Sequence, residues 1–108
     1  MPSAAHGMLR LRISAEARAD LAEIDEWGAQ RFGQDVADAY SRGFREAFAL
    51  LRSFPDIGSP RRRLGAGIRC LVHRQHRLFY RVQDDAIIIL RVVHHAMDAR
   101  RALKGAAG

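Results

Sequence analysis

The sequence has a single cysteine and no long apolar run, and each scarcity excludes a class of protein. Cys70 alone forms neither an intrachain disulfide nor a cysteine-based zinc site. The longest apolar run, residues 86–90, is far too short to span a membrane, so we expect no membrane partner. Residues 1–7 contain no basic stretch followed by an apolar core, so we expect no signal peptide. A lone cysteine without a leader favours a reducing, cytoplasmic location.

The rest of the composition is that of an ordinary globular protein. The 108 residues are 48% hydrophobic and 28% charged, which suffices for one packed domain and excludes wholesale disorder. Residues 1–8 carry no periodic pattern. We therefore predict a flexible N-terminal extension over residues 1–8 and a single domain over residues 9–104.

The excess positive charge lies entirely in the second half of the chain. Residues 1–54 hold 7 Lys and Arg against 8 Asp and Glu, a net charge of −1. Residues 55–108 hold 11 against 4, a net charge of +7, which gives the +6 of the whole chain. This distribution favours an anionic partner, either nucleic acid or an acidic protein segment.

The spacing of apolar residues predicts six secondary-structure elements. Period-two alternation marks the strands, and apolar residues three and four apart mark the helices, which end at Gly33 and Pro55. The tail from His94 is too short to predict another element. The six elements are a strand over residues 9–13, helices over residues 15–31 and 35–53, and strands over residues 68–73, 76–83 and 86–93.

This order, strand–helix–helix–strand–strand–strand, predicts an α+β fold. We expect a helical hairpin packed on one face of a four-stranded, mostly antiparallel sheet. The last strand is apolar on both faces, so it lies inside the sheet and pairs with the first strand. The expected strand order is 1-4-3-2. Gly28 and Gly43 lie in the apolar stripes and are expected to let the two helices approach closely.

Alternation places a set of arginines on the sheet face away from the helices. If Leu9, Leu11 and Ile13 face the helices, five guanidinium groups share the opposite face, and Arg91 joins them if Ile88, Leu90 and Val92 are the helix-facing residues of the last strand. Six such groups suit carboxylate or phosphate ligands. Two interpretations stay open, a solvated outer face and a partner groove. The residues expected on this face are Arg10, Arg12, Arg69, Arg77, Arg81 and Arg91, with the apolar Leu71, Phe79 and Ile89 between them.

Four histidines lie near the ends of the predicted strands. His73 and His76 flank a turn, and His94 and His95 follow the last strand. No acidic or thiolate ligand accompanies them at a recognisable spacing, so we predict no metal and no cofactor. One of them can serve as a general acid–base in RNA cleavage, because the pKa of histidine lies near neutrality. The simpler interpretation is that all four are surface side chains.

Several short motifs, taken in order, resemble the ParE/RelE family of toxins. The run from Leu11 to Trp27, with its Ser14 cap, is similar to the opening strand and helix of that family. No single motif is as specific as a metal-ligand signature, but their order agrees with the predicted elements. The similarity covers residues 8–98 and continues through Phe32-Gly33, Leu51-Arg-Ser-Phe-Pro55, His76-Arg-Leu-Phe-Tyr80 and Ile89-Leu-Arg91-Val-Val-His94.

The resemblance implies the toxin of a bacterial type II toxin–antitoxin system, made from one operon with a small antitoxin. In this family the antitoxin binds operator DNA, so the toxin would bind DNA indirectly. ParE-like members poison DNA gyrase by binding, whereas RelE-like members cleave mRNA on the ribosome. The chain has no tyrosine after Tyr80, and its C-terminal tail lacks the Tyr or Glu of many RNA-cleaving relatives. We therefore expect a ParE-like gyrase inhibitor without a catalytic site, neutralised by a ParD-like antitoxin.

Two alternatives to this expectation stay open. The first is an mRNA endoribonuclease, whose catalytic set would be Arg69, Arg81, Arg91 and His94. The second is a degenerate toxin that retains only antitoxin binding. In the favoured interpretation the antitoxin covers the basic sheet face and the adjacent helical groove. The residues expected to bind the target or the antitoxin are Arg61, Arg62, Arg63, Arg69, Leu71, Phe79, Arg81 and Arg91.

Overall fold

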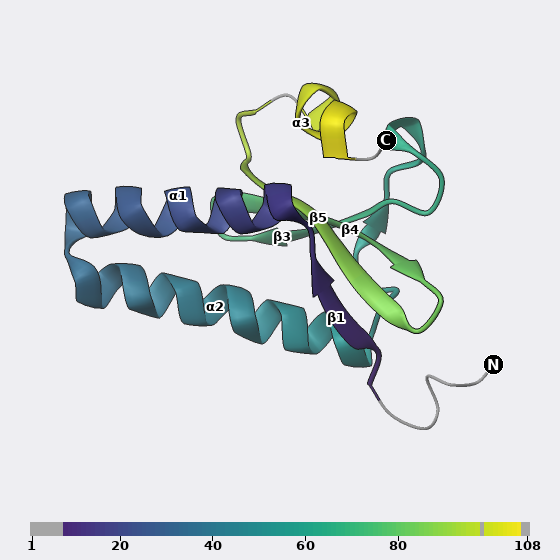
Figure 1. Cartoon of the computed structure of the whole chain (residues 1–108), viewed down its shortest axis with the longest axis horizontal. Helices are drawn as coiled ribbons and strands as arrows, with labels where there is room; N and C mark the ends of the chain where they lie inside the picture. Colours follow the sequence, from purple (N-terminus) through teal and green to yellow (C-terminus); the bar gives the residue numbers. More distant parts are fainter. Residues whose placement is uncertain (1–7, 98, 107–108) are drawn as a thin grey trace.

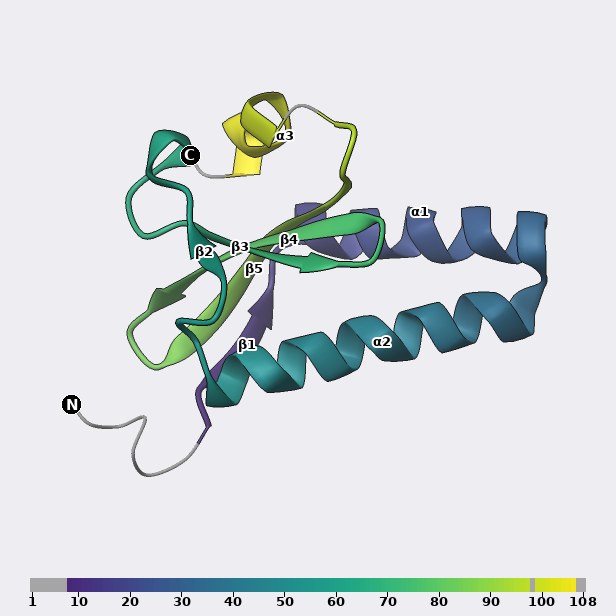
Figure 2. The same ribbon diagram turned by 180° about the vertical axis from the view of Figure 1, so that it is seen from behind.

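Two long helices form an antiparallel hairpin that packs on one face of a five-stranded sheet, and a short third helix covers the other face (Figures 1 and 2). The computed structural model describes residues 8–97 and 99–106. The predicted flexible extension therefore lies outside the described residues, apart from Met8. No helix among the described residues is long and apolar enough to cross a membrane.

The helical hairpin begins at a side-chain cap and turns at a glycine. Ser14 precedes α1 (Ala15–Phe32), where its Oγ accepts a hydrogen bond from the Ala17 N–H at 3.0 Å. Gly33, with a φ of +91°, separates α1 from α2 (Gln34–Ser53). Both predicted helices are confirmed to within one residue or two.

The sheet follows the predicted order, with one strand added at its edge. The four expected strands are confirmed in the order 1-4-3-2, and the first of them pairs with the last in parallel. The prediction of four strands is wrong, because a two-residue strand from the turn-rich loop pairs with the outer edge. In spatial order the strands are β1 (Arg10–Ile13), β5 (Ala86–His94), β4 (His76–Gln83), β3 (Arg69–His73) and β2 (Ser59–Pro60).

The prediction that no element follows His94 is also wrong. A helix, α3 (Ala99–Ala106), packs on the sheet face opposite the hairpin (Figure 2). Its Ala102 and Leu103 are buried against Cys70 and Phe79. The three-residue helix η2 (Arg62–Leu64) covers the end of the same face. Both faces of the sheet are therefore covered, one by the long hairpin and one by short segments.

A bulge in β5 decides which side chains point to which face. Phe79 pairs with Arg91 but Tyr80 pairs with Ile89, so Leu90 is an extra residue in β5. Up to Ile89 the odd-numbered residues of β5 face the hairpin core, and after the bulge Val92 does so. Leu90 and the adjacent Ile88 pack toward α3 instead. The predicted assignment of Ile88 and Leu90 to the hairpin face, and of Ile89 to the other, is wrong.

The two glycines of the apolar stripes serve different neighbours. A Cβ on Gly28 would lie 3.6 Å from the Cβ of Ala37, an ordinary contact, so the two helices are neighbours here but their spacing does not require a glycine. A Cβ on Gly43 would lie 2.7 Å from Nε2 of His73, so Gly43 makes room for a ring from the sheet. The prediction that the two glycines permit close helix approach is therefore wrong at Gly43, and at Gly28 an alanine would fit as well.

Candidate functional site

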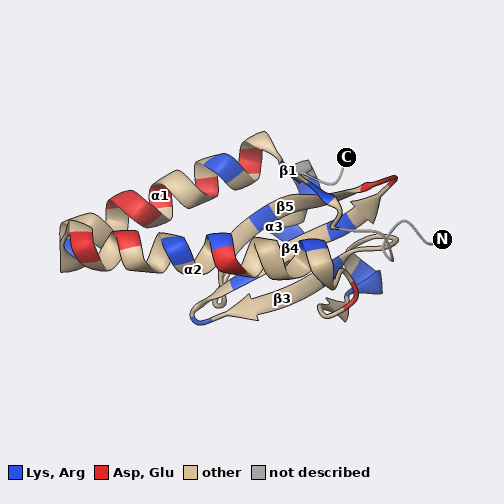
Figure 3. Cartoon of the chain, turned by 90° about the horizontal axis from the view of Figure 1, so that it is seen from below, with Lys and Arg blue, Asp and Glu red and all other residues tan. Residues whose placement is uncertain are grey.

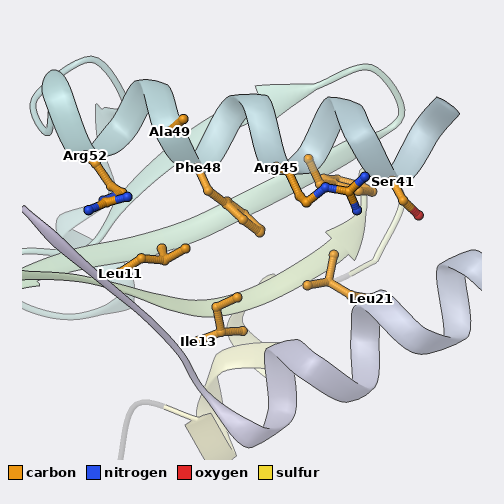
Figure 4. A pocket seen from close by; sticks show the side chains of 9 residues that line it. Leu11, Ile13, Leu21, Ser41, Arg45, Phe48, Ala49 and Arg52 are labelled. Carbon is orange, nitrogen blue, oxygen red and sulfur yellow. The ribbon is translucent and has the colours of Figure 1, made fainter. Parts of the chain in front are cut away.

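An open groove lies between α2, α1 and β1 (Figure 4). Its volume is about 400 Å³, which is large enough for several side chains of a partner segment. Figure 4 shows Phe48 projecting from α2 into the space between that helix and β1. This hairpin groove is lined by Leu11, Ile13, Leu21, Ser41, Phe44, Arg45, Phe48, Ala49 and Arg52.

The hairpin groove combines an apolar floor with a cationic rim. Leu11 is 36% exposed although it is a leucine in a strand, whereas Phe48 is buried. Arg45 is exposed on α2, and Arg52 donates a hydrogen bond from Nε to the Leu9 carbonyl at 2.6 Å. β1 is an edge strand, so its outer backbone is open to pairing. The groove suits a peptide that alternates apolar side chains with carboxylates.

Two of the predicted binding arginines are engaged inside the fold. Nε and NH2 of Arg91 donate to the two carboxylate oxygens of Asp20 at 2.7 and 2.8 Å, and its NH1 donates to the Ala102 carbonyl at 2.5 Å. The hydrogen bonds to Asp20 raise the pKa of Arg91 further. NH1 of Arg69 donates to the carbonyl of Gly58 at 2.7 Å. Both side chains join elements of the fold, so neither is free to extend toward a partner.

The remaining predicted arginines lie at the sheet end opposite the hairpin turn. Arg62 and Arg63 are exposed in η2, and exposed Arg61 donates from NH1 to Oγ of Ser59 at 2.8 Å. Arg81 is half-buried on β4. Figure 3 shows Lys and Arg spread over this end, with most acidic segments on α1 and α2. The predicted concentration of positive charge is therefore present, but on exposed segments around the sheet.

The predicted apolar part of the basic face is wrong. Phe79 is fully buried beneath α3, and a cation–π contact brings the Arg77 guanidinium 5.5 Å from its ring. Leu71 packs against the hairpin core on the opposite face. The unpredicted helix α3 covers Phe79, which is why its exposure was mispredicted. Neither residue contributes exposed apolar surface to a common face with the arginines.

The four residues of the alternative ribonuclease set are dispersed. Arg69 lies beside Gly58 and Arg91 is paired with Asp20, whereas His94 lies at the far end of β5 opposite His76. Arg81 pairs with Ile88 near the other end of that strand. The sheet therefore gives these side chains no common point around one phosphate.

The histidines do gather at one end of the sheet, against α2. His76 Nδ1 shares a hydrogen bond with the Tyr40 hydroxyl at 2.8 Å, and the rings of His73 and His94 lie nearby. Burial, and then the charge of His94, lower the pKa of His76 to about 4. Within the described residues no three His, Cys, Asp or Glu side chains are placed to hold a metal ion. His76 is thus a neutral, partly buried ring at pH 7.

Two buried groups, the Tyr80 hydroxyl and the Cys70 thiol, stabilise the fold. The Tyr80 hydroxyl donates to the Pro55 carbonyl at 2.7 Å and accepts from the Gly58 N–H at 2.9 Å. Burial raises the pKa of Tyr80, and burial likewise raises that of Cys70. Tyr80 fixes the loop after α2 onto the sheet, and Cys70 stays a protonated core side chain.

A helical groove was expected from the sequence, but the residues that line the hairpin groove were not predicted, because they come from three separate elements. Arg45 and Arg52 are one heptad step apart on α2, with Phe48 between them, which is a weak signal of a basic stripe beside an apolar one. That spacing does not show that a groove lies between α2 and β1.

Comparisons with known proteins agree on one family. The family described as "ParE toxin of type II toxin-antitoxin system, parDE" matches residues 11–99. Toxin ParE1 of Caulobacter vibrioides is 36% identical over 92 residues, covering 85% of this chain and 95% of that protein. Toxin ParE1 of Mycobacterium tuberculosis is 36% identical over 95 residues, covering 87% of this chain and 97% of that protein.

Two solved structures share the fold. One, described as a chromosomal ParDE toxin–antitoxin system from P. aeruginosa, matches with a TM-score of 0.70 and 26% identity over 81% of this chain and 96% of that chain. The other, the toxin–antitoxin complex RelBE2 from Mycobacterium tuberculosis, matches with a TM-score of 0.59 and 29% identity over 84% of this chain and 95% of that chain.

Proposed function

Because the chain belongs to the ParE toxin family of type II toxin–antitoxin systems, we propose that it inhibits DNA gyrase by binding and is neutralised by a ParD-like antitoxin from the same operon. The toxin acts in the cytoplasm, where both the antitoxin and gyrase are present. It meets operator DNA only through the antitoxin. The hairpin groove is the observation that carries the antitoxin part of this proposal.

The antitoxin segment that fits the hairpin groove is apolar and acidic. Its apolar side chains would cover Leu11 and Phe48, and its carboxylates would face Arg45 and Arg52 on the rim. A peptide strand can also pair with the open edge of β1. Both relatives with the same fold were solved as parts of toxin–antitoxin systems, which supports a partner of this kind.

Charge reversal on the groove rim tests the antitoxin site. Arg45→Glu should slow association with the antitoxin and weaken the complex, with a smaller loss of rate at high salt. Arg62→Glu is the matched control, because Arg62 is also exposed but lies in η2, away from the groove. Surface plasmon resonance at two salt concentrations would give the association rates of both variants with the antitoxin and show which arginine contributes to binding. An effect confined to Arg62→Glu would move the antitoxin to the basic sheet end and reject the groove.

The proposed inhibition of gyrase requires a binding surface on the toxin and no catalytic group. Arg61, Arg62 and Arg63 are exposed on one loop and suit an acidic protein surface or DNA backbone. Loss of one contact among several weakens binding by degrees, about 1–3 kcal/mol each, whereas loss of a general base costs a factor of about 10²–10⁴ in rate. Successive Arg→Ala changes in this loop should therefore erode growth inhibition stepwise.

A supercoiling assay with purified gyrase tests the target directly. The toxin should inhibit supercoiling or accumulate cleaved DNA, and equimolar antitoxin should restore activity. Normal supercoiling at a large excess of folded, antitoxin-competent toxin would refute the gyrase target. If growth is also unaffected, the chain is the degenerate toxin that only binds its antitoxin.

One observation favours RelE-like mRNA cleavage as the second candidate. The Tyr40 hydroxyl and the ring of His76 share a hydrogen bond at 2.8 Å beside His94, so two groups that can carry a proton lie next to each other there. His94→Ala and His95→Ala, each alone, should leave growth inhibition intact if the gyrase proposal holds. Abolished toxicity with unchanged folding and antitoxin binding would favour cleavage instead.

A further inference from the structure

The turn of the helical hairpin carries large apolar side chains that the fold leaves exposed. Trp27 is 57% exposed, Phe32 58% and Val36 52%, and they flank the Gly33 turn between α1 and α2. Figures 1 and 2 show this turn projecting away from the sheet, at the end of the molecule opposite β1 and the β4–β5 turn. These three residues, called the hairpin tip below, contribute little to either core.

The aromatic side chains of the hairpin tip are held in place before any partner binds. The rings of Trp27 and Phe32 meet edge to face with centroids 5.7 Å apart. The Arg31 guanidinium lies over the Trp27 ring, 5.0 Å from its centroid. Such contacts reduce the rotamer entropy lost on binding, so a partner gains more from the exposed area. Exposed aromatic residues of this kind are the usual anchors of protein interfaces.

The charge around the hairpin tip is opposite to that of the rest of the chain. Residues 23–38 hold five acidic residues and one arginine, a net charge of −4 against +6 for the whole chain. None of the five carboxylates forms an ion pair with another described residue. They are Glu23, Asp25, Glu26, Asp35 and Asp38.

This charge selects the chemistry of the partner. A nucleic acid or an anionic membrane would be repelled by a net charge of −4. An acidic antitoxin segment, which fits the arginine rim of the hairpin groove, would be repelled as well. Two copies cannot join tip to tip without bringing two such acidic clusters together, and a head-to-tail contact would use up the basic sheet end that the proposed function assigns to the target. The partner that best fits the hairpin tip is therefore a different protein, with an apolar surface surrounded by basic residues.

We propose that the hairpin tip is a second docking surface, which inserts Trp27 and Phe32 into an apolar recess ringed by Lys and Arg on the target protein. This inference rests on the proposed function, since the target named there is gyrase. A protein that handles DNA carries basic surfaces of this kind around its DNA path. The basic sheet end of the toxin and its acidic tip would then contact the DNA and the protein of one complex.

The test measures binding of the full toxin to purified gyrase holoenzyme, with antitoxin binding and melting temperature measured in parallel. Trp27→Ser and Phe32→Ser should each weaken gyrase binding by about tenfold or more, the loss typical of an aromatic anchor. Antitoxin affinity and folding should stay unchanged, because both side chains are more than half exposed. Phe54→Ser is the matched control, since Phe54 is also 58% exposed at a helix end but lies at the end of α2 next to the sheet.

A second pair of variants tests the charge. Glu26→Lys and Asp35→Lys should slow association with gyrase, and the loss should shrink as salt rises.

The other possible results each refute either the docking surface or the proposed function. If wild-type toxin binds gyrase and the tip variants bind equally well, the docking surface is refuted and the proposed function stands. If wild-type toxin does not bind gyrase, the proposed function and the target named for the tip both fail. Equal losses in Phe32→Ser and Phe54→Ser would reject the tip as a specific surface. A loss of antitoxin binding in the tip variants, or salt-sensitive self-association of wild type, would assign the tip to one of those partners instead.

Discussion

Neutralising Asp20 should destabilise the protein more than any other single carboxylate change at an ion pair. Asp20 accepts two hydrogen bonds from the Arg91 guanidinium and one from the Val92 N–H at 2.9 Å. The side chains of Arg91 and Asp20 are only 20% and 12% exposed. Asp20→Asn keeps the shape, but its NH2 group faces a donor and Arg91 loses its counter-charge. Removing one partner of a buried pair costs about 3–5 kcal/mol, and partial exposure reduces this to about 2–3 kcal/mol here.

Thermal unfolding measures this loss directly. For a domain of this size about 1 kcal/mol corresponds to about 4–5 °C in Tm, so Asp20→Asn should lower Tm by about 8–15 °C. The matched control is Asp85→Asn, which removes an exposed ion pair to Arg10 at 3.7 Å and should change stability by less than about 1 kcal/mol. Because Arg91 also holds the Ala102 carbonyl, amide exchange in α3 should rise in Asp20→Asn. Equal, small Tm shifts in both variants would refute the reasoning.

The stability of the fold should also respond to pH, to a methyl group added at a glycine and to loss of the Tyr80 hydroxyl. The pKa of His76 is held at about 4, below 6.5, so the unfolded chain binds a proton that the folded protein excludes between these values. The free energy of unfolding should therefore fall by about 1–2 kcal/mol between pH 7 and pH 4 because of His76, a value reduced for solvent screening of the half-buried ring. In denaturant unfolding at several pH values, His76→Asn should show a weaker pH dependence than wild type. Parallel curves for the two proteins would contradict this. Gly28→Ala should raise Tm slightly, because the new Cβ meets only ordinary contacts in a helix, whereas Gly58→Ala should lower it sharply, because its Cβ would lie 2.5 Å from the Tyr80 oxygen. Tyr80→Phe should cost about 1–3 kcal/mol in chemical denaturation, since a buried carbonyl and N–H lose their partner, and an unchanged midpoint would remove the loop-fixing role of this hydroxyl.

Local chemistry made most of the fold predictable. Ser14 and Gly33 are a strong cap and a strong turn residue, so the helix limits were confirmed closely. The apolar run of residues 86–90 placed β5 inside the sheet and so gave the strand order. These features depend on short-range geometry or on burial, which a sequence records directly.

Which sheet face each side chain lies on could not be predicted throughout, because it depends on features that leave no pattern in the sequence. The bulge at Leu90 lies in a run that is apolar on both faces, so no alternation marks the extra residue. Among the residues of α3 whose burial the structure describes, Ala102 and Leu103 alone are buried on the sheet, which is too few for a recognisable helical stripe. The bulge misplaced Ile88, Ile89 and Leu90, and the unpredicted helix left Phe79 on the surface in the prediction. The hairpin groove depends on the spacing of α1, α2 and β1 in three dimensions, which packing alone decides.

The excess of positive charge in the second half of the chain was predicted correctly. The arginines that are free to bind a partner were predicted only in part. Arg69 and Arg91 became internal links because backbone carbonyls and Asp20 came within reach in the folded chain. A count of charges does not distinguish a guanidinium that joins elements from one that reaches a partner. The exposed Arg61–Arg63 loop and the groove rim keep that second capacity.

One experiment decides whether this toxin stops growth through gyrase, as proposed, or by cutting RNA. The most direct measurement is to express the chain without its antitoxin and to map DNA breaks and mRNA ends in the same cells. The account predicts DNA breaks with gyrase covalently attached to their ends, while ribosome-bound mRNA stays intact. Ribosome-phased mRNA cleavage that precedes any DNA break would contradict it and establish the ribonuclease function.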